Sequence, residues 1–268
     1  MKDKPLVSVI VPTMNSQKHI KFCLDGLMSQ TYGRIEIIVV DSYSKDRTAE
    51  IVSEYPAKLL FCDGIRSEAR NIGACSSKGE FLLSVDSDMR LVPNVISECV
   101  DAIGDSYDAI VIPEISIGEG FWAGCKALEK RCYVGDDLIE ASRFFRKTIF
   151  EKVGGYDPEL EAGEDWDIHE RIRAVGGRIN RVGSVVEHDE GNLSLRTTVS
   201  RKYGYGKTMK RYISKHPERA KRQLSIFRPA FFNSWHKLAD DPIHAIGLFV
   251  VKTCEFVASN LASISHSK

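Results

Sequence analysis

The stretch Gly79-Glu80-Phe81-Leu82-Leu83-Ser84-Val85-Asp86-Ser87-Asp88 decides the fold, because an apolar run ends there in two carboxylates. Phe81–Val85 lacks the polar alternation of a half-exposed strand, which is typical of a strand buried on both faces of a parallel sheet. If the chain stays extended past Val85, Asp86 and Asp88 should converge while Ser87 turns aside. Two carboxylates at the C-terminal end of a parallel strand would attract a hard divalent cation. A solvated Asp-Ser-Asp turn explains the same residues equally well.

Three more apolar runs precede this strand, and turn residues and a helical pattern follow each one. The runs are Leu6–Val11 before Pro12-Thr13-Met14-Asn15, Ile35–Val40 before Asp41, and Ala57–Phe61 before Asp63-Gly64. Right-handed strand–helix–strand crossovers would bring the ends of these strands to one edge of a sheet. The predicted fold class is therefore α/β, with a Rossmann-like, mostly parallel central sheet flanked by helices and a helical C-terminal extension.

The residues at these strand ends suit a nucleotide. Carboxylates such as Asp41 and Asp63 can bind ribose hydroxyls or a metal, and arginines can bind phosphate oxygens. Arg66 and Arg70 are four apart and should share a helix face, while Thr13 and Asn15 belong to a small polar loop. Each residue alone is equally well explained as a turn former or a solvated charge, so the interpretation depends on the set. Neither GxGxxG after the first strand nor GxxxxGK[ST] occurs, which excludes the dinucleotide fingerprint and the P-loop.

Composition excludes several classes of protein. The 268 residues include 37 Lys plus Arg and 37 Asp plus Glu, so the net charge does not favour a nucleic-acid partner. Seven scattered cysteines without a CxxC pair argue against a disulfide framework and a zinc site, and favour a reducing cytoplasm.

A second group of carboxylates lies in Gly163-Glu164-Asp165-Trp166-Asp167. Ile168, Ile172 and Val175 follow at helical spacing, so Glu164 and Asp165 should occupy the first turn of a helix. Acidic residues are stabilised at a helix N-terminus whatever else they do. Further on, Ile179–Val186 predicts a strand that runs into His188.

Taken in order, these pieces resemble the family 2 glycosyltransferases of GT-A fold over roughly the first three quarters of the chain. The matching segments are Val9–Asn15, Val39–Ser42, Ala69-Arg70-Asn71-Ile72-Gly73, Asp86-Ser87-Asp88, Gly154-Gly155-Tyr156-Asp157, Gly163–Asp167 with Arg171, and His188.

The resemblance implies transfer of a sugar from a nucleotide diphosphate donor, with inversion at the anomeric carbon and a divalent cation. Asp86-Ser87-Asp88 matches the family's DxD motif, in which the second carboxylate holds the metal and the first lies near ribose and metal. Glu164-Asp165 matches the ED motif, whose Asp is the general base, and His188 matches a histidine that completes the metal site in some members. The loop Pro12–Asn15, Asp41 and the region Asp63–Arg70 match positions that hold base, ribose and phosphates.

The chemistry can also be argued from the reaction. Negative charge develops on the leaving diphosphate, and a cation held by Asp88 and His188 would stabilise that charge. A mixed oxygen and imidazole shell favours Mn²⁺ over Mg²⁺, although the sequence leaves both open. The attacking acceptor hydroxyl must lose a proton on the opposite side of the sugar, and Asp165 is the candidate base.

For the donor and the acceptor, the sequence indicates a class of molecule and not a particular one. Processive members of the family carry a Gln-x-x-Arg-Trp motif, which is missing from Arg201–Lys207, so addition of a single sugar is expected. The resemblance implies a UDP- or GDP-linked sugar as donor, and we expect the acceptor to be a glycan or a lipid-linked molecule.

The C-terminal part has two interpretations. We expect a catalytic domain at 1–208, with nucleotide-sugar binding in 1–90 and the acceptor side in 91–208, and a helical extension at 209–268. Basic residues followed by Phe227, Phe231, Phe232 and Trp235 suit peripheral contact with an anionic membrane at its cytoplasmic face. Alternatively, the apolar segment Pro242–Ile264 packs against the catalytic domain or a twin subunit in a homodimer. Lys252 and Glu255 near its centre make full membrane insertion costly.

Two other functions compete with glycosyl transfer. A sugar-phosphate nucleotidyltransferase would also use such a sheet and metal-binding carboxylates, but should show a glycine-rich loop where Pro12-Thr13-Met14-Asn15 stands. A non-catalytic nucleotide-sugar-binding protein would have no need of Asp86, Asp88, Asp165 and His188.

Overall fold

The structure is a computed structural model that describes residues 4–265 and divides into two compact units. The first unit comprises the chain up to Pro113, Ala141–Glu159 and Glu164–His188, and the second comprises Glu114–Glu140, Leu160–Gly163 and the chain from Asp189 onward. The predicted functional division into residues 1–208 and 209–268 stays a prediction.

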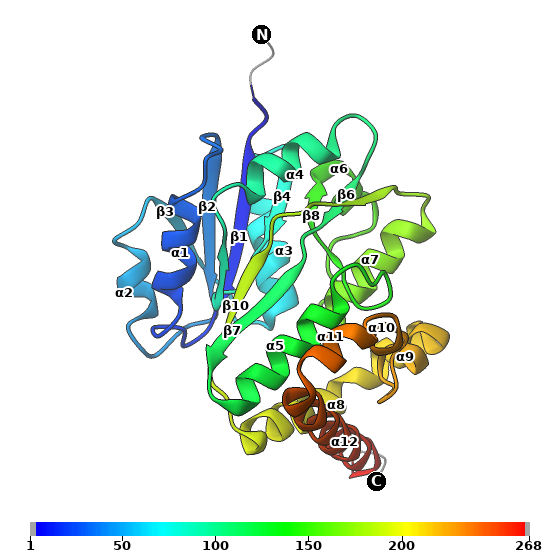
Figure 1. Cartoon of the computed structure of the whole chain (residues 1–268). Coiled ribbons are helices and arrows are strands. Elements are labelled where there is room, and N and C mark those ends of the chain that lie inside the picture. The colour runs from blue at the N-terminus through cyan, green and yellow to red at the C-terminus, as the bar shows by residue number, and fades with distance from the viewer. Residues whose placement is uncertain (1–3, 266–268) are drawn as a thin grey trace. The chain divides into compact units, whose positions relative to one another are not determined.

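A seven-stranded sheet forms the centre of the first unit (Figure 1). Neighbours are parallel except where the fifth strand in spatial order runs antiparallel to both of its neighbours. The mostly parallel α/β sheet predicted from the sequence is therefore confirmed. In spatial order the strands are β3 (Ala57–Phe61), β2 (Ile35–Asp41), β1 (Val7–Thr13), β4 (Phe81–Ser84), β8 (Ser142–Arg146), β6 (Ala109–Val111) and β9 (Ile179–Arg181).

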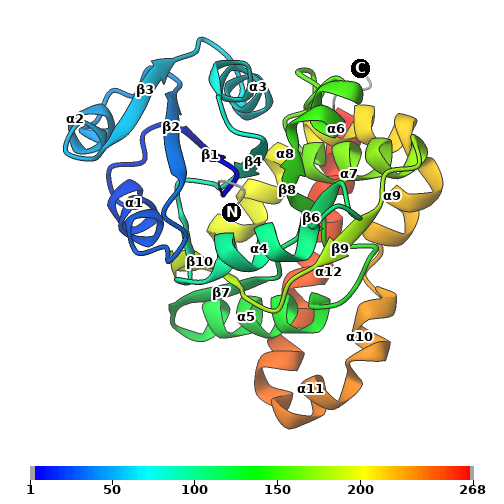
Figure 2. The ribbon, with the colours of Figure 1, turned by 90° about the horizontal axis from the view of Figure 1, so that it is seen from above.

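Helices cover both faces of this sheet, as Figure 2 shows from above. Val7, Val9 and Val11 of β1 point to one face, where they pack with α1 (Ile20–Met28), α2 (Thr48–Val52) and α4 (Val95–Ile103). Ile10 points to the other face, which α3 (Arg66–Ser76), α6 (Lys147–Lys152) and α7 (Glu164–Ala174) cover. Because both faces are covered, every residue of β1 is buried.

Two predicted strand boundaries are wrong. The first strand continues through Pro12 to Thr13, with Pro12 paired to Val40. Proline is tolerated there because its fixed φ suits an extended chain and the pairing of β1 with β4 ends at Ile10. The predicted strand Ile179–Val186 is two strands, since the chain bends near Gly183 between β9 and β10 (Val186–Asn192). Val186–His188 of β10 pair antiparallel with β5 (Met89–Leu91) in a separate small sheet.

The second unit is mainly helical. The apolar side of α5 packs against α10 and α12 through Leu128, Phe231, Ala245 and Leu248. Its elements are β7 (Glu114–Glu119), α5 (Phe121–Tyr133), α8 (Leu195–Lys215), α9 (Pro217–Gln223), α10 (Pro229–Asn233), α11 (Trp235–Asp240) and α12 (Pro242–Ser265).

A buried group of charges joins α12 to α5. The ammonium of Lys252 lies 2.5 Å from Glu129 and also pairs with Glu255, and Lys126 lies 2.9 Å from Glu129. Lys252 and Glu255 are thus buried inside the unit as ion pairs, which avoids the cost of isolated buried charges. Helix α12 therefore packs on other helices of the same chain, which is one of the two packing arrangements expected from the sequence. Throughout residues 4–265, we find no helix with the length and apolarity needed to cross a membrane.

Candidate active site

Two loops at the carboxyl ends of β1 and β2 are hydrogen-bonded to each other. Thr13 pairs with Asp41 in the parallel register, and the amide of Asn15 donates to Ser44 Oγ at 2.7 Å. Asp41 is buried, and its carboxylate accepts hydrogen bonds from the amide and the hydroxyl of Ser44. The structure therefore brings together Pro12, Thr13, Asn15 and Asp41, as their positions at the strand ends predict.

Asp63, by contrast, lies exposed in the loop after β3. It does not belong to the group of side chains described below.

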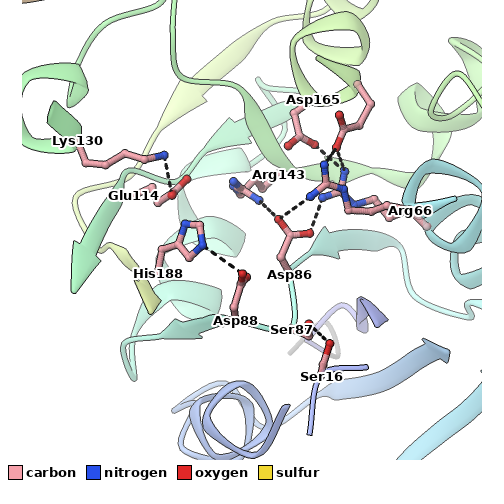
Figure 3. Close-up of polar contacts among 12 residues, drawn as sticks. Ser16, Arg66, Asp86, Ser87, Asp88, Glu114, Lys130, Arg143, Asp165 and His188 are labelled. Atoms are coloured by element: carbon pink, nitrogen blue, oxygen red, sulfur yellow. Dashed lines mark hydrogen bonds and ion pairs between the residues drawn. The ribbon is translucent and has the colours of Figure 1, made fainter. Parts of the chain in front are cut away.

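The segment Asp86-Ser87-Asp88 turns instead of staying extended. The amide of Met89 donates to the carbonyl of Asp86 at 3.0 Å, which closes a turn over the intervening residues. The prediction that Asp86 and Asp88 converge is therefore wrong, because their side chains meet different partners: arginines for Asp86 and His188 for Asp88 (Figure 3). Ser87 Oγ lies 2.9 Å from Ser16 Oγ and connects the turn to the loop after β1.

Three arginines surround Asp86. Its carboxylate oxygens lie 2.6 Å from Arg70 Nη2, 3.6 Å from Arg143 Nη1 and 4.0 Å from Arg66 Nη1. Burial alone would raise the pKa of Asp86, but the guanidinium groups of Arg70, Arg66 and Arg143 outweigh it and hold this pKa below its ordinary value. Asp86 is consequently a stable anion whose charge is already balanced by cations.

Arg70 connects the Asp86 turn to the start of α7. Its side chain is fully buried, with the guanidinium 4.9 Å from the centre of the Tyr156 ring. Nη1 donates to Asp165 Oδ1 at 2.9 Å and to Glu164 Oε1 at 3.1 Å, while Nη2 donates to Asp86. The guanidinium of Arg70 is therefore bonded to Asp165, 95 positions away in the chain, as well as to Asp86.

Asp165 is accessible although it is ion-paired. Its side chain keeps 25% of its exposure, compared with 4% for Glu164 beside it. Within the described part of the chain, its hydrogen bond and ion pair both use Oδ1. Asp165 thus has a fixed orientation and contact with solvent, as a base that receives a proton from a bound acceptor requires.

Glu164 has a different environment. Burial and the neighbouring Asp165 carboxylate raise the pKa of Glu164, even though Arg66 and Arg70 act in the opposite direction. Arg66 Nη2 lies 2.9 Å from Glu164 Oε1. The two carboxylates of the ED pair therefore differ, since Glu164 is enclosed by arginines and Asp165 reaches the surface.

Asp88 and His188 form the pair that can hold a metal. His188 pairs with Met89 across β10 and β5, and this register places its Nε2 3.2 Å from Asp88 Oδ2. One carboxylate oxygen and one imidazole nitrogen suit a divalent ion that takes its remaining ligands from water and phosphates. In the described chain, no group of three His, Cys, Asp or Glu is arranged to hold a metal.

Sequence reasoning missed Arg143, Ser16 and Ser44. Arg143 is on β8, which pairs antiparallel with β4, and only this long-range pairing brings it beside Asp86. The signal available in the sequence was an arginine directly before the apolar pair Phe144-Phe145.

Some residues of the family motifs build the scaffold instead of the site. The side chain of Asn71 exchanges hydrogen bonds of 2.8 and 2.9 Å with the backbone of Tyr156. Arg171 pairs with Asp167 at 2.7 Å and donates to the carbonyls of Val153 and Gly155. These contacts fix the turn after α6, in which Gly155 has a φ of 68° that favours glycine.

Fold and site together define a class of protein. An open α/β sheet carries, at the carboxyl ends of its strands, a cluster of arginines, a carboxylate–histidine pair and a partly exposed carboxylate. This combination suits chemistry on a phosphorylated ligand, because arginines bind phosphate oxygens and the carboxylate–histidine pair binds the accompanying cation.

Comparison with known proteins specifies the class. The profile of glycosyl transferase family 2 matches residues 8–154, which is more than half of the chain, and the chain belongs to this family. An uncharacterized glycosyltransferase of Rickettsia typhi is 35% identical over 192 residues, covering 61% of this chain and 57% of the relative. One from Haemophilus influenzae is 27% identical over 176 residues, covering 60% of each. The chain thus spans about 57–60% of the length of these relatives.

Solved structures show the same fold. A mannosyltransferase from Pyrobaculum calidifontis, in complex with GDP-Man and Mn²⁺, superposes with a TM-score of 0.66 at 17% identity, covering 100% of this chain and 89% of that one. Residues 1–349 of TarS from S. aureus, in complex with UDP-GlcNAc, give a TM-score of 0.57 at 17% identity, covering 98% and 91%. The architecture is the GT-A fold, and residues 8–154 carry a family 2 glycosyltransferase domain.

Proposed function

We propose that this chain is a cation-dependent, inverting glycosyltransferase that moves one sugar from a nucleotide diphosphate donor to an acceptor hydroxyl or phosphate. The observation that carries the proposal is the contact of one buried guanidinium, Arg70, with both Asp86 and Asp165, while Asp88 of the same turn meets His188. Candidate donor-binding and proton-accepting groups are therefore linked through a few side chains of one unit.

Donor binding uses the loops at the carboxyl ends of β1 and β2 and the arginine cluster. Asp41 and the loop Pro12–Asn15 would hold the nucleoside, with Asp41 fixed by Ser44. Arg66 is 37% exposed and can turn toward a diphosphate, whereas Arg70 is enclosed and keeps Asp86 and Asp165 in place.

Asp88 and His188 would hold the cation, either Mn²⁺ or Mg²⁺. A bound cation neutralises the charge that develops on the departing diphosphate. Asp86, balanced by three arginines, is better suited to fixing the turn than to binding the metal.

Asp165 would accept the proton of the incoming acceptor hydroxyl. Attack from the side opposite the leaving group inverts the anomeric carbon and requires a base on that side. General base catalysis of this kind contributes roughly a hundredfold to ten-thousandfold in rate.

The acceptor is a glycan or a lipid-linked molecule. All seven cysteines are unpaired, which agrees with a reducing cytoplasmic setting.

A thermal-shift screen of UDP- and GDP-sugars with and without Mn²⁺ tests the proposal. A ligand that binds the folded state raises the melting temperature, so one donor should stabilise the protein only when the cation is present. Release of the free nucleoside diphosphate from that donor would then exclude the non-catalytic binding protein. Formation of a nucleotide sugar from a sugar phosphate and a nucleoside triphosphate would instead identify a nucleotidyltransferase and contradict the proposal.

A further inference from the structure

Helix α12 has one buried face and one exposed face. Ala245, Leu248, Val251 and Glu255 are buried, and the helix packs on α5 and α8 within the second unit (Figure 1). This buried face also contains Lys252, whose ion pair with Glu129 fixes the rotation of the helix. The opposite face is therefore turned outward in a defined orientation.

The exposed face of α12 is apolar. Ile243 and Ile246 are each 69% exposed, and Val250 and Val257 are 44% and 50% exposed. Their spacing of three, four and seven residues places them along one side of the helix. An exposed helix face in a soluble domain is normally polar, so this stripe is unusual.

Exposed aromatic side chains extend the stripe. Phe227 and Phe232 are each 65% exposed and Trp235 is 68% exposed. Phe227 and helix α11 adjoin α12, because the Phe227 ring lies 6.3 Å from the ring of Phe249 and α11, which begins with Trp235, contacts α12. Phe232 belongs to α10, which contacts α11. We call these seven residues the apolar face: Phe227, Phe232, Trp235, Ile243, Ile246, Val250 and Val257. Exposed apolar side chains that gather in this way mark an interaction site.

The segment of the chain that precedes α12 is strongly basic. Between residue 195 and the start of α12 there are three carboxylates, Glu218, Asp240 and Asp241, against twelve Lys and Arg, although the whole chain is balanced at 37 to 37. Arg228 is buried in the charge group around Glu129, but Lys221 and Arg222 on α9 are exposed. Arg222 lines the same recess as Pro229 and Asn233 of α10. A cationic side chain therefore lies beside the helix that carries Phe232. The cationic residues of the segment are Arg196, Arg201, Lys202, Lys207, Lys210, Arg211, Lys215, Arg219, Lys221, Arg222, Arg228 and Lys237.

We infer that the apolar face is a docking surface for an anionic lipid bilayer. Aliphatic and aromatic side chains beside Lys and Arg are the composition of helices that lie in the membrane interface, where the side chains enter the lipid and the cations meet the headgroups. A second copy of the chain is a poorer occupant, because pairing two such faces would bring two basic segments together.

This inference is independent of the catalytic proposal. Docking would place the second unit at the surface where a lipid-linked acceptor is found, but vesicle binding is measured without donor, cation or acceptor. If no sugar transfer were found, the docking inference would therefore still stand. If no vesicle binding were found, the proposed sugar transfer would still stand.

The test uses the full chain and vesicles of phosphatidylcholine with and without phosphatidylglycerol. Sedimentation with vesicles should show binding that requires the anionic lipid and weakens as salt is added. The variant Trp235→Ala/Ile243→Ser/Ile246→Ser should lower the partition coefficient by at least about tenfold, because it removes apolar area that the lipid covers. Lys221→Glu/Arg222→Glu should weaken binding to the anionic vesicles.

Met28→Ser/Val175→Ser is the matched control. These residues of the first unit are 51% and 41% exposed, so the change removes exposed apolar area elsewhere and should leave binding unaltered. The vesicle-binding variants should unfold at the same temperature as the parent chain, since the replaced side chains are exposed. Equal sedimentation of parent and variant with anionic vesicles would overturn the inference. So would a dimer, detected by light scattering, that the same three substitutions dissociate.

Discussion

Arg70 should be the side chain on which the site depends most for its stability. It is fully buried and faces the carboxylates of Asp86, Glu164 and Asp165. Replacing it with methionine keeps much of the apolar stem but leaves three carboxylates without their shared cation. We expect Arg70→Met to lower the free energy of unfolding by about 3–5 kcal/mol, the usual cost of removing one partner from a buried ion pair.

The matched control for this substitution is an arginine pair at the surface. Arg47 Nη2 lies 2.8 Å from Glu50, with 67% and 59% of the two side chains exposed. Because solvent screens exposed pairs, Arg47→Met should leave the free energy of unfolding almost unchanged.

Urea denaturation of both variants at neutral pH measures the two values. A second comparison isolates the charge effect: Arg70→Met/Glu164→Gln has one fewer uncompensated carboxylate and should recover part of the lost stability. If Arg70→Met were no more harmful than Arg47→Met, the arginine would not be holding the carboxylates together, and the account of the site would fail.

Three further predictions concern the metal pair, acid stability and the second unit. His188→Ala should weaken Mn²⁺-dependent donor binding by about 10–100-fold in a thermal-shift titration, and should leave the melting temperature of the ligand-free protein unchanged. If the variant lost the same donor affinity when Mn²⁺ is absent, His188 would not act as a metal ligand. The folded pKa of Asp86 is lowered, so its ionisation stabilises the fold above the unfolded value of about 3.9 and this contribution is lost as pH falls through the folded pKa. In Asp86→Asn, the free energy of unfolding should therefore fall less steeply as the pH is lowered below about 4. Urea titrations that show the same dependence on pH in variant and parent would contradict this prediction. Lys252→Met should lower the free energy of unfolding by about 3–5 kcal/mol. In a double-mutant cycle, Lys252→Met/Glu129→Gln should lower it by less than the sum of the two single changes, and strict additivity would mean that the pair is not coupled.

The sheet could be predicted because its strands are encoded locally. Apolar runs such as Phe81–Val85 are specific for strands buried on both faces, and the turn residues that follow them mark the edge where ligands bind. The expectation that Asp41 and the Pro12–Asn15 loop meet was correct for the same reason, since the parallel register brings adjacent strand ends together.

Long-range contacts explain what could not be predicted. The direction of Asp86 depends on three arginines, of which Arg143 comes from an antiparallel strand almost sixty residues away. Helical spacing indicated that Arg66 and Arg70 share a face, but not that Arg70 is completely enclosed while Arg66 is accessible. Similarly, Lys252 argued against full membrane insertion of its helix, but the sequence did not indicate that Glu129 on α5 would be its partner inside the folded unit.

The most direct test of the proposed roles compares Asp165→Asn with Asp88→Asn in the presence of Mn²⁺ and the donor found by the screen. Asparagine at 165 keeps an oxygen that can accept from Arg70 but is not a base, so nucleoside diphosphate release should fall by about a hundredfold to ten-thousandfold. Its donor affinity should stay close to that of the parent chain, whereas Asp88→Asn should weaken cation-dependent donor binding. Equal loss of donor affinity in the two variants would contradict the assignment of base and metal ligand to these two carboxylates.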